Sequence, residues 1–202
     1  MKIPFSLYST KWPLDFQERA ETIRQAVGNL PITIDHIGST SVVGLGAKPI
    51  IDILIGVEKE EDLDQLIRPM MVYGYTYFKK YEQEMPYRRL FVLLKPLTEL
   101  QPPTIIDLDD DYNSGELFTP VVNVHAIVKD THHWTRHIAF RDFLREHPDV
   151  TKRYHQLKEQ LSQQEFAHHL EYNNAKNNFV KELEQEALIW FETPDKSIAN
   201  NG

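Results

Sequence analysis

The sequence predicts an α+β protein, in which a mixed β-sheet has flanking helices and a C-terminal helical subdomain. Short β-branched segments alternate with amphipathic ones up to residue 128, and the remainder has helical periodicity. Strands followed by a run of helices are typical of the α+β class. We therefore expect three parts: an α/β core with an N-terminal helix at residues 1–130, the helical subdomain at 131–192, and a flexible tail at 193–202.

The first expected element is an amphipathic helix that begins near Pro13 and ends at Gly28. Its apolar residues recur every three or four positions, at Phe16, Ala20, Ile23 and Val27. Further helices are expected over 60–73, 134–146, 148–163 and 166–191. Pro13 and Pro148 both suit the first turn of a helix, because the amide hydrogen that proline lacks would be unpaired there anyway.

Strands are expected at five places: 32–37, 50–57, 75–78, 88–94 and 121–128. The segment 50–57 is apolar at nearly every position, which is typical of a strand buried on both faces. Its one carboxylate, Asp52, is costly there unless it is paired or binds a metal. The proline-rich stretch 95–120 is compatible with a hairpin extension or with a surface loop.

The composition limits the partners and the chemistry. The 202 residues include 22 Lys and Arg against 30 Asp and Glu, a net charge of −8, which disfavours extended nucleic acid but allows a local basic pocket. The absence of cysteine excludes disulfides, thiolate metal sites and thiol catalysis. No apolar run has the length of a signal peptide or a membrane helix, so we expect a cytoplasmic protein with no membrane partner.

The segment most informative about function is 34–57. A strand there leads into a loop of one glycine and three hydroxyl residues: Gly38, Ser39, Thr40 and Ser41. Hydroxyls and loop amides at a tight turn are suited to hold a phosphate, and Lys48 would add a positive charge. A capped turn that satisfies Asp52 by hydrogen bonds explains the same pattern about equally well.

The same segment closely resembles the GrpB family, which is assigned to the nucleotidyltransferase superfamily. The resemblance covers nearly the whole chain and is weakest over 95–120. The matching residues are 36–42, Gly44, Leu45 and 47–53 in the first block, 138–145 with Tyr154, Leu157 and Lys158 in the second, and Tyr172 with Lys176 in the third. The resemblance implies a nucleotidyltransferase-like sheet.

The resemblance also implies a metal and its ligands. Nucleotidyltransferases of this fold hold a nucleotide triphosphate with a Gly-Ser turn and Mg²⁺ with two carboxylates on the next strand, often with a third from a later strand. Here Asp52 matches the first carboxylate, position 54 is Leu, and His125 stands where a third carboxylate is expected. Asp52 is therefore the expected Mg²⁺ ligand and His125 a candidate base, but the missing carboxylate weakens the case for two-metal transfer.

Cationic and aromatic residues of the matching blocks extend the expected phosphate site. A nucleotide or other phosphorylated small molecule is expected to contact the loop and Lys48, Arg141, Lys158, Tyr172 and Lys176. Arg88, Arg89 and Arg136 are further cations that could face the same loop. Alternatively, Arg141 pairs with Asp142 or a helix end, and Lys158 is simply solvated.

These observations leave three functions open. The first is a Mg²⁺-dependent nucleotidyl or phosphoryl transferase with a small-molecule acceptor. The second is a non-catalytic module for a nucleotide or coenzyme-A-related ligand, since some family members are fused to dephospho-coenzyme A kinase. The third is an interaction role through the C-terminal helices. The missing carboxylate at Leu54 favours the second function over the first, and the retained loop and cations favour both over the third.

Overall fold

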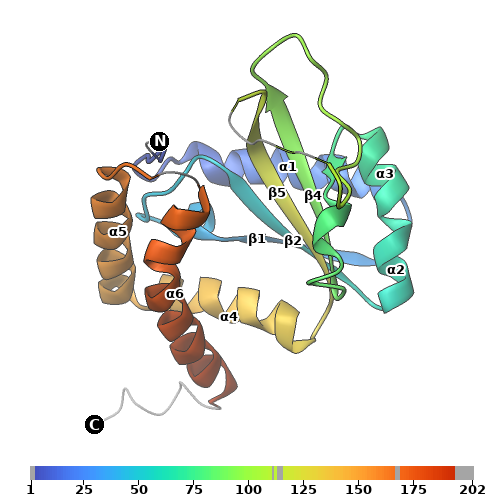
Figure 1. Cartoon of the computed structure of the whole chain (residues 1–202). Helices are drawn as coiled ribbons and strands as arrows, with labels where there is room; N and C mark the ends of the chain where they lie inside the picture. The colour runs from blue at the N-terminus through green and yellow to red at the C-terminus, as the bar shows by residue number, and fades with distance from the viewer. Residues whose placement is uncertain (1–2, 111, 113–115, 167–168, 194–202) are drawn as a thin grey trace.

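The computed structural model describes residues 3–110, 112, 116–166 and 169–193, and it confirms a mixed sheet with flanking helices (Figure 1). The strands are β1 (Ile32–Ile37), β2 (Ile51–Val57), β3 (Thr76–Tyr77), β4 (Arg88–Pro96) and β5 (Phe118–Val128). The helices are α1 (Lys11–Val27), α2 (Glu60–Gln65), α3 (Ile67–Val72), α4 (His132–Glu146), α5 (Pro148–Ser162) and α6 (His169–Glu192), with short 3₁₀ turns η1 (Ser39–Ser41) and η2 (Lys79–Tyr81).

The strand order in the sheet is β1-β2-β5-β4-β3. Only β2 and β5 run parallel to each other, and the other neighbouring pairs are antiparallel. Asp52 of β2 lies opposite Asn123 of β5, and His125 lies opposite Leu54. This register decides which polar side chains share a face of the sheet.

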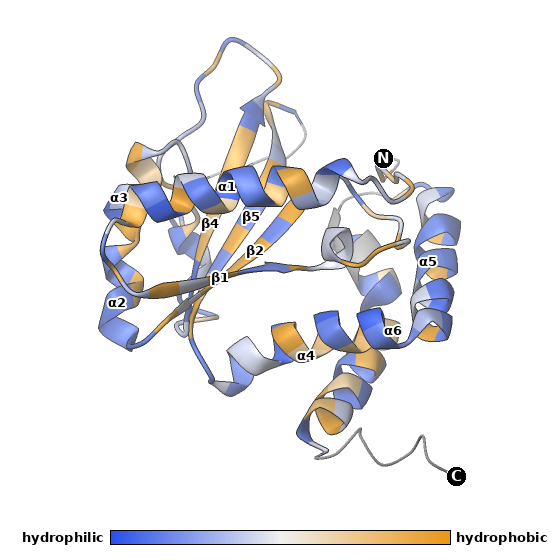
Figure 2. Ribbon diagram, turned by 180° about the vertical axis from the view of Figure 1, so that it is seen from behind, coloured by the Kyte–Doolittle hydropathy of each residue, from blue (hydrophilic) through white to orange (hydrophobic). Residues whose placement is uncertain are grey.

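One face of the sheet carries the main hydrophobic core. Alternate residues of β2, from Ile51 to Val57, pack with Trp12 and Ile23 of α1 and with Leu63 of α2. Figure 2 shows α1 lying across this face. Because side chains of a strand alternate between faces, Asp52 and Leu54 belong to the opposite face.

The opposite face is covered by the C-terminal helices only in part. Leu54 and Ile127 pack there against Ile138 of α4. Helices α4, α5 and α6 share a second core with the loop after η1, formed by Val42, Leu45, Ala139, Phe143, Leu144, Val150, Tyr154, Leu183 and Ala187. The helices therefore pack directly against the loop that was predicted to bind phosphate.

Three predicted elements differ in extent. The expected helix over 60–73 is two short helices, because Pro69 cannot donate the amide hydrogen bond to residue 65 that a continuous helix requires. Strand β3 has only two residues. Strands β4 and β5 extend to the pair Pro96–Phe118, so of the two alternatives for 95–120 the structure has the hairpin extension.

Helix α4 begins at His132, and α5 and α6 follow it along the chain. Of the predicted tail at 193–202, only Thr193 belongs to the described residues. Among the helices that the structure describes, none combines the length and the apolar character needed to cross a membrane.

Candidate anion-binding site

The turn between β1 and β2 brings the backbone of Gly38 against the carboxylate of Asp52. Gly38 has φ 67° and ψ −172°, a region that only glycine adopts readily. A Cβ atom at this position would collide with Oδ2 of Asp52. The close approach that this glycine permits is therefore toward the carboxylate of the next strand.

Two of the three predicted hydroxyls hold the turn itself. Ser41 donates a hydrogen bond to the carbonyl of Gly38 at 2.7 Å, and Thr40 lies 3.0 Å from Nε2 of His36. Burial, with the charges of Arg145 and Arg141, lowers the pKa of His36 to about 4, so this ring is neutral at pH 7. Among the predicted hydroxyls, only that of Ser39 makes no side-chain hydrogen bond within the described residues.

Asp52 is held by its neighbour on β5. Nδ2 of Asn123 donates to Oδ1 of Asp52 over 2.9 Å. Burial raises the pKa of Asp52, while the bond from Asn123 and nearby lysine charges oppose that rise. The carboxylate is thus paired to an amide rather than to a second carboxylate.

The positive charges of three lysines act on this carboxylate and lower its pKa. They are Lys48, Lys158 and Lys176, which we call the lysine cluster. They come from the loop before β2, from α5 and from α6, so packing of the C-terminal helices assembles the cluster. Lys158 is 3% exposed, and its Nζ has no hydrogen-bond partner among the described residues. Its Nζ lies 4.7 Å from the centre of the Tyr154 ring, a cation–π contact.

The pKa values of all three ammonium groups of the lysine cluster are lowered. Burial lowers the pKa of Lys158 to about 7 and that of Lys48 to about 8, and in both cases the charge of Lys176 adds to the effect. Burial also lowers the pKa of Lys176. An anion beside these ammonium groups would stabilise their charged forms.

Position 54, where the resemblance implies a second carboxylate, is closed to solvent. Leu54 lies on the same face as Asp52, is 0% exposed, and packs with Ile37, Ile127 and Ile138. A carboxylate could not replace this side chain without disrupting the apolar cluster.

The described residues do not fit Mg²⁺ well. They include no group of three or more His, Cys, Asp or Glu side chains that could hold a metal ion. Asp52 is the carboxylate nearest the Gly38 turn, and a divalent cation there would be repelled by the lysine cluster. Mg²⁺ also prefers several oxygen ligands, which this arrangement does not supply.

His125 lies on the same face as Asp52, two residues along β5 from Asn123. Its Nδ1 is 3.2 Å from Nη1 of Arg88. Arginine can only donate, so Nδ1 accepts and the ring carries its hydrogen on Nε2. Burial, with the charges of His137, Arg88 and Arg136, lowers the pKa of His125 well below its usual value. The lone pair that a general base would use is therefore already engaged.

Arg141 lies away from the lysine cluster. Its Nη1 is 2.9 Å from Oδ1 of Asp35, and its Nε is 2.7 Å from Oδ1 of Asp142. These two carboxylates balance its charge, which agrees with the alternative in which Arg141 pairs with Asp142. The side chain of Tyr172 lies outside the described part of the chain.

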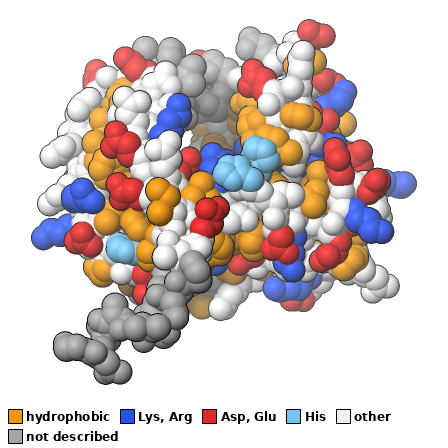
Figure 3. All heavy atoms as spheres, turned by 90° about the horizontal axis from the view of Figure 1, so that it is seen from below, with side chains coloured by type: hydrophobic (Ala, Val, Ile, Leu, Met, Phe, Trp, Pro, Cys, Tyr) orange, Lys and Arg blue, Asp and Glu red, His pale blue; other side chains and the backbone are white. Residues whose placement is uncertain are grey.

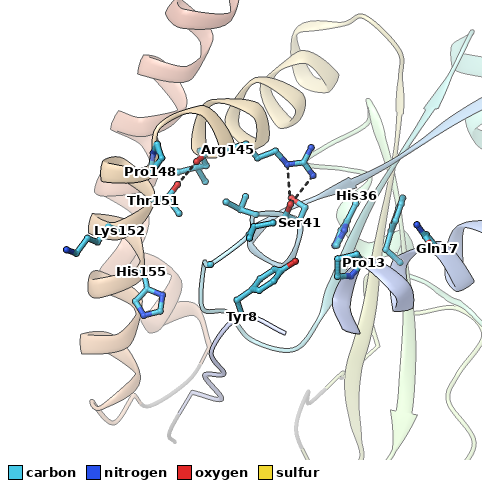
Figure 4. A pocket seen from close by; sticks show the side chains of 15 residues that line it. Tyr8, Pro13, Gln17, His36, Ser41, Arg145, Pro148, Thr151, Lys152 and His155 are labelled. Atoms are coloured by element: carbon cyan, nitrogen blue, oxygen red, sulfur yellow. Dashed lines mark hydrogen bonds between the residues drawn. The ribbon is translucent and has the colours of Figure 1, made fainter. Parts of the chain in front are cut away.

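A separate cavity of about 720 Å³ lies between the start of α1 and the α4–α5 junction (Figure 4). Two hydrogen bonds join groups that line it: Arg145 donates to the carbonyl of Ser41 over 2.9 and 3.2 Å, and Thr151 donates to the carbonyl of Leu144. Of the predicted site residues, only Ser41 lines it. This cavity and the lysine cluster are thus different places.

Fold and site together describe a mixed α+β protein in which a strand, a Gly-Ser turn and a second strand present one carboxylate beside lysines from the C-terminal helices. A family profile described as "GrpB protein" matches residues 2–186. The chain belongs to the GrpB family, and this is consistent with the predicted place in the nucleotidyltransferase superfamily.

The chain is similar to UPF0157 protein YqkA of Bacillus subtilis, with 33% identity over 189 residues, 94% of this chain but 48% of YqkA. It thus spans about half the length of that relative. The crystal structure of conserved protein GrpB from Enterococcus faecalis matches with a TM-score of 0.74 at 30% identity, over 94% of this chain and 100% of that one. A stretch of 68 residues, 32% of this chain, is 35% identical to part of a dephospho-CoA kinase from Mycolicibacterium paratuberculosis, covering 17% of that enzyme.

Proposed function

We propose that this chain binds a phosphorylated small molecule at the lysine cluster, without needing Mg²⁺. The observation that carries the proposal is the buried ammonium group of Lys158, which has no hydrogen-bond partner among the described residues and shares one carboxylate with two other lysines. A buried charge without a hydrogen-bond partner is costly, and a phosphate would offset that cost. The hydroxyl of Ser39 is a further donor at the same turn.

A nucleotide or a coenzyme-A-related molecule is the ligand class that we favour. The partial similarity to a dephospho-CoA kinase supports this class, because that enzyme's name refers to a phosphorylated, nucleotide-containing substrate. The nucleotidyltransferase-like sheet supports it as well. In this proposal the protein binds and positions the ligand, and Asp52 orients Asn123 and limits the net charge.

A Mg²⁺-dependent nucleotidyl or phosphoryl transferase is the second candidate. The placement of Asp52 beside the Gly38 turn favours it, because the resemblance assigns the metal to this carboxylate. The buried Leu54 and the engaged lone pair of His125 count against it. The two candidates give opposite expectations for Asp52.

Replacing Asp52 with asparagine is expected to increase the affinity for ADP, and Mg²⁺ is expected to leave that affinity unchanged. The substitution removes the negative charge of Asp52 beside the lysine cluster and keeps the side-chain shape. Calorimetric titration of wild type and Asp52→Asn, with and without Mg²⁺, measures both effects. The control is Asp109→Asn, an exposed carboxylate far along the chain. ADP binding that requires Mg²⁺ and is lost in Asp52→Asn would instead support the transferase.

The affinity for sulfate is expected to fall roughly tenfold or more as the pH rises from about 6.5 to about 9. Lys158 and Lys48 lose their protons in this range, since their pKa values are about 7 and about 8. Sulfate keeps one charge state over the whole range, so the change reports the protein alone. Titrations at several pH values measure it, and a flat profile would contradict the assignment of these lysines.

A further inference from the structure

A second group of hydrogen-bond donors lies beside the lysine cluster on the same face of the sheet. Arg88 at the start of β4 and His125 of β5 form it, and we call them the donor pair. Because Nδ1 of His125 accepts from Arg88, the pair offers outward only the remaining N–H groups of Arg88 and the Nε2–H of His125. No acceptor belongs to the pair.

The charges around the donor pair are mostly positive or absent. Arg136 of α4 contributes to the lowered pKa of both Arg88 and His125, and its own Nε is buried without a hydrogen-bond partner among the described residues. Its Nη1 is 3.3 Å from Glu184 of α6, which balances one charge. The ring of His137 is 5.6 Å from that of His125, and burial lowers its pKa to about 3, so it is neutral.

The donor pair and the lysine cluster lie within reach of one ligand. Asp52 is opposite Asn123, and His125 follows two residues later on β5, about 6.6 Å along the strand. Residues two apart on a strand point to the same face, so His125 lies on the same side of the sheet as Asp52, on which the charges of the lysine cluster act. In Figure 3, Lys or Arg side chains and histidines gather around a recess on the face seen from below.

We propose that Arg88 and His125 bind a second anionic group of the same ligand, which is therefore a small molecule with two separate phosphate groups, such as a nucleoside bisphosphate. This inference rests on the proposed function, because the lysine cluster is taken to hold the first phosphate. Arginine suits the second group, since its planar guanidinium can donate two hydrogen bonds to one phosphate. Because the donor pair offers only N–H groups and lies beside the lysine cluster, a positively charged group of the ligand would be repelled there.

The test compares adenosine 3′,5′-bisphosphate with 5′-AMP by calorimetric titration. Wild type is expected to bind the bisphosphate roughly tenfold tighter or better, the usual gain from a charge-assisted contact. In Arg88→Met this advantage is expected to disappear, while AMP affinity changes less than about twofold. The control is Arg153→Met, an exposed arginine of α5, which is expected to leave both affinities unchanged.

Other variants separate the inference from the proposed function. His125→Leu should also remove the bisphosphate advantage, whereas His125→Gln should keep much of it, because an amide can accept from Arg88 and still donate. Thermal unfolding without ligand shows whether each variant is folded. Equal affinities for AMP and the bisphosphate in wild type, or an equal loss of both in Arg88→Met, would overturn the inference. AMP binding unaffected by Lys158→Met would overturn the proposed function instead.

Discussion

Replacing Lys158 with methionine is expected to stabilise the folded protein by roughly 1–3 kcal/mol and to abolish phosphate binding. The stabilisation follows because the side chain is 3% exposed and its ammonium group is not hydrogen-bonded within the described residues. Methionine fills a similar volume without a charge. The loss of binding follows because the same ammonium group supplies charge to the anion site.

The pH dependence of that stability difference has a definite sign. Burial lowers the pKa of Lys158 from 10.5 to about 7 in the folded protein. Between these values the unfolded chain binds a proton that the folded chain does not, so stability of the wild type rises with pH. The advantage of Lys158→Met is therefore largest at or below about pH 7 and vanishes above about pH 10.5.

Urea unfolding at several pH values measures the stability, and titration with inorganic phosphate measures binding. The matched control is Lys152→Met, an exposed lysine on the same helix, for which neither quantity should change. A variant that binds no phosphate and is also less stable would show that Lys158 has a structural role. A stable variant that still binds phosphate would remove Lys158 from the site.

The sequence predicts the local elements of the site better than their assembly. The strand 50–57 and its lone carboxylate are readable because an apolar run with one aspartate has few explanations. Gly38 is readable for a similar reason, since a glycine at a strand end indicates a tight turn or a close approach. Both features depend only on residues that are neighbours in the sequence.

Features that depend on long-range packing could not be predicted in the same way. The bond between Arg88 and His125 requires the register of β4 against β5, which no local pattern specifies. Arg141 and Lys158 are both cations of the family blocks. Arg141 pairs with two carboxylates, whereas Nζ of Lys158 has no hydrogen-bond partner in the described part of the chain. The packing of α4 and α5 against the rest of the protein decides these surroundings. It makes Arg141 a structural cation and leaves Lys158 as a candidate for ligand binding.

Replacing Gly38 with alanine is expected to destabilise the fold by roughly 3 kcal/mol or more and to displace Asp52. The backbone angles of Gly38, φ 67° and ψ −172°, disfavour any side chain. The added Cβ would also overlap with Oδ2 of Asp52. The β1–β2 turn could relieve that overlap only by moving the carboxylate away from Asn123 and the lysines.

Gly44→Ala on the same loop isolates the backbone contribution. Gly44 also has a positive φ, 81°, but a Cβ there would meet nothing within 4 Å, so roughly 1–2 kcal/mol is expected. The double variant Gly38→Ala, Asp52→Ala removes the overlap with the carboxylate but keeps the Cβ of residue 52, 3.0 Å from the added one. Compared with Asp52→Ala alone in urea unfolding, it should recover much of the difference between the two single glycine variants. If Gly38→Ala cost no more than Gly44→Ala, the contact between the turn and the carboxylate would not constrain the site. In that case the position of Asp52 would depend on Asn123 and the lysine cluster alone.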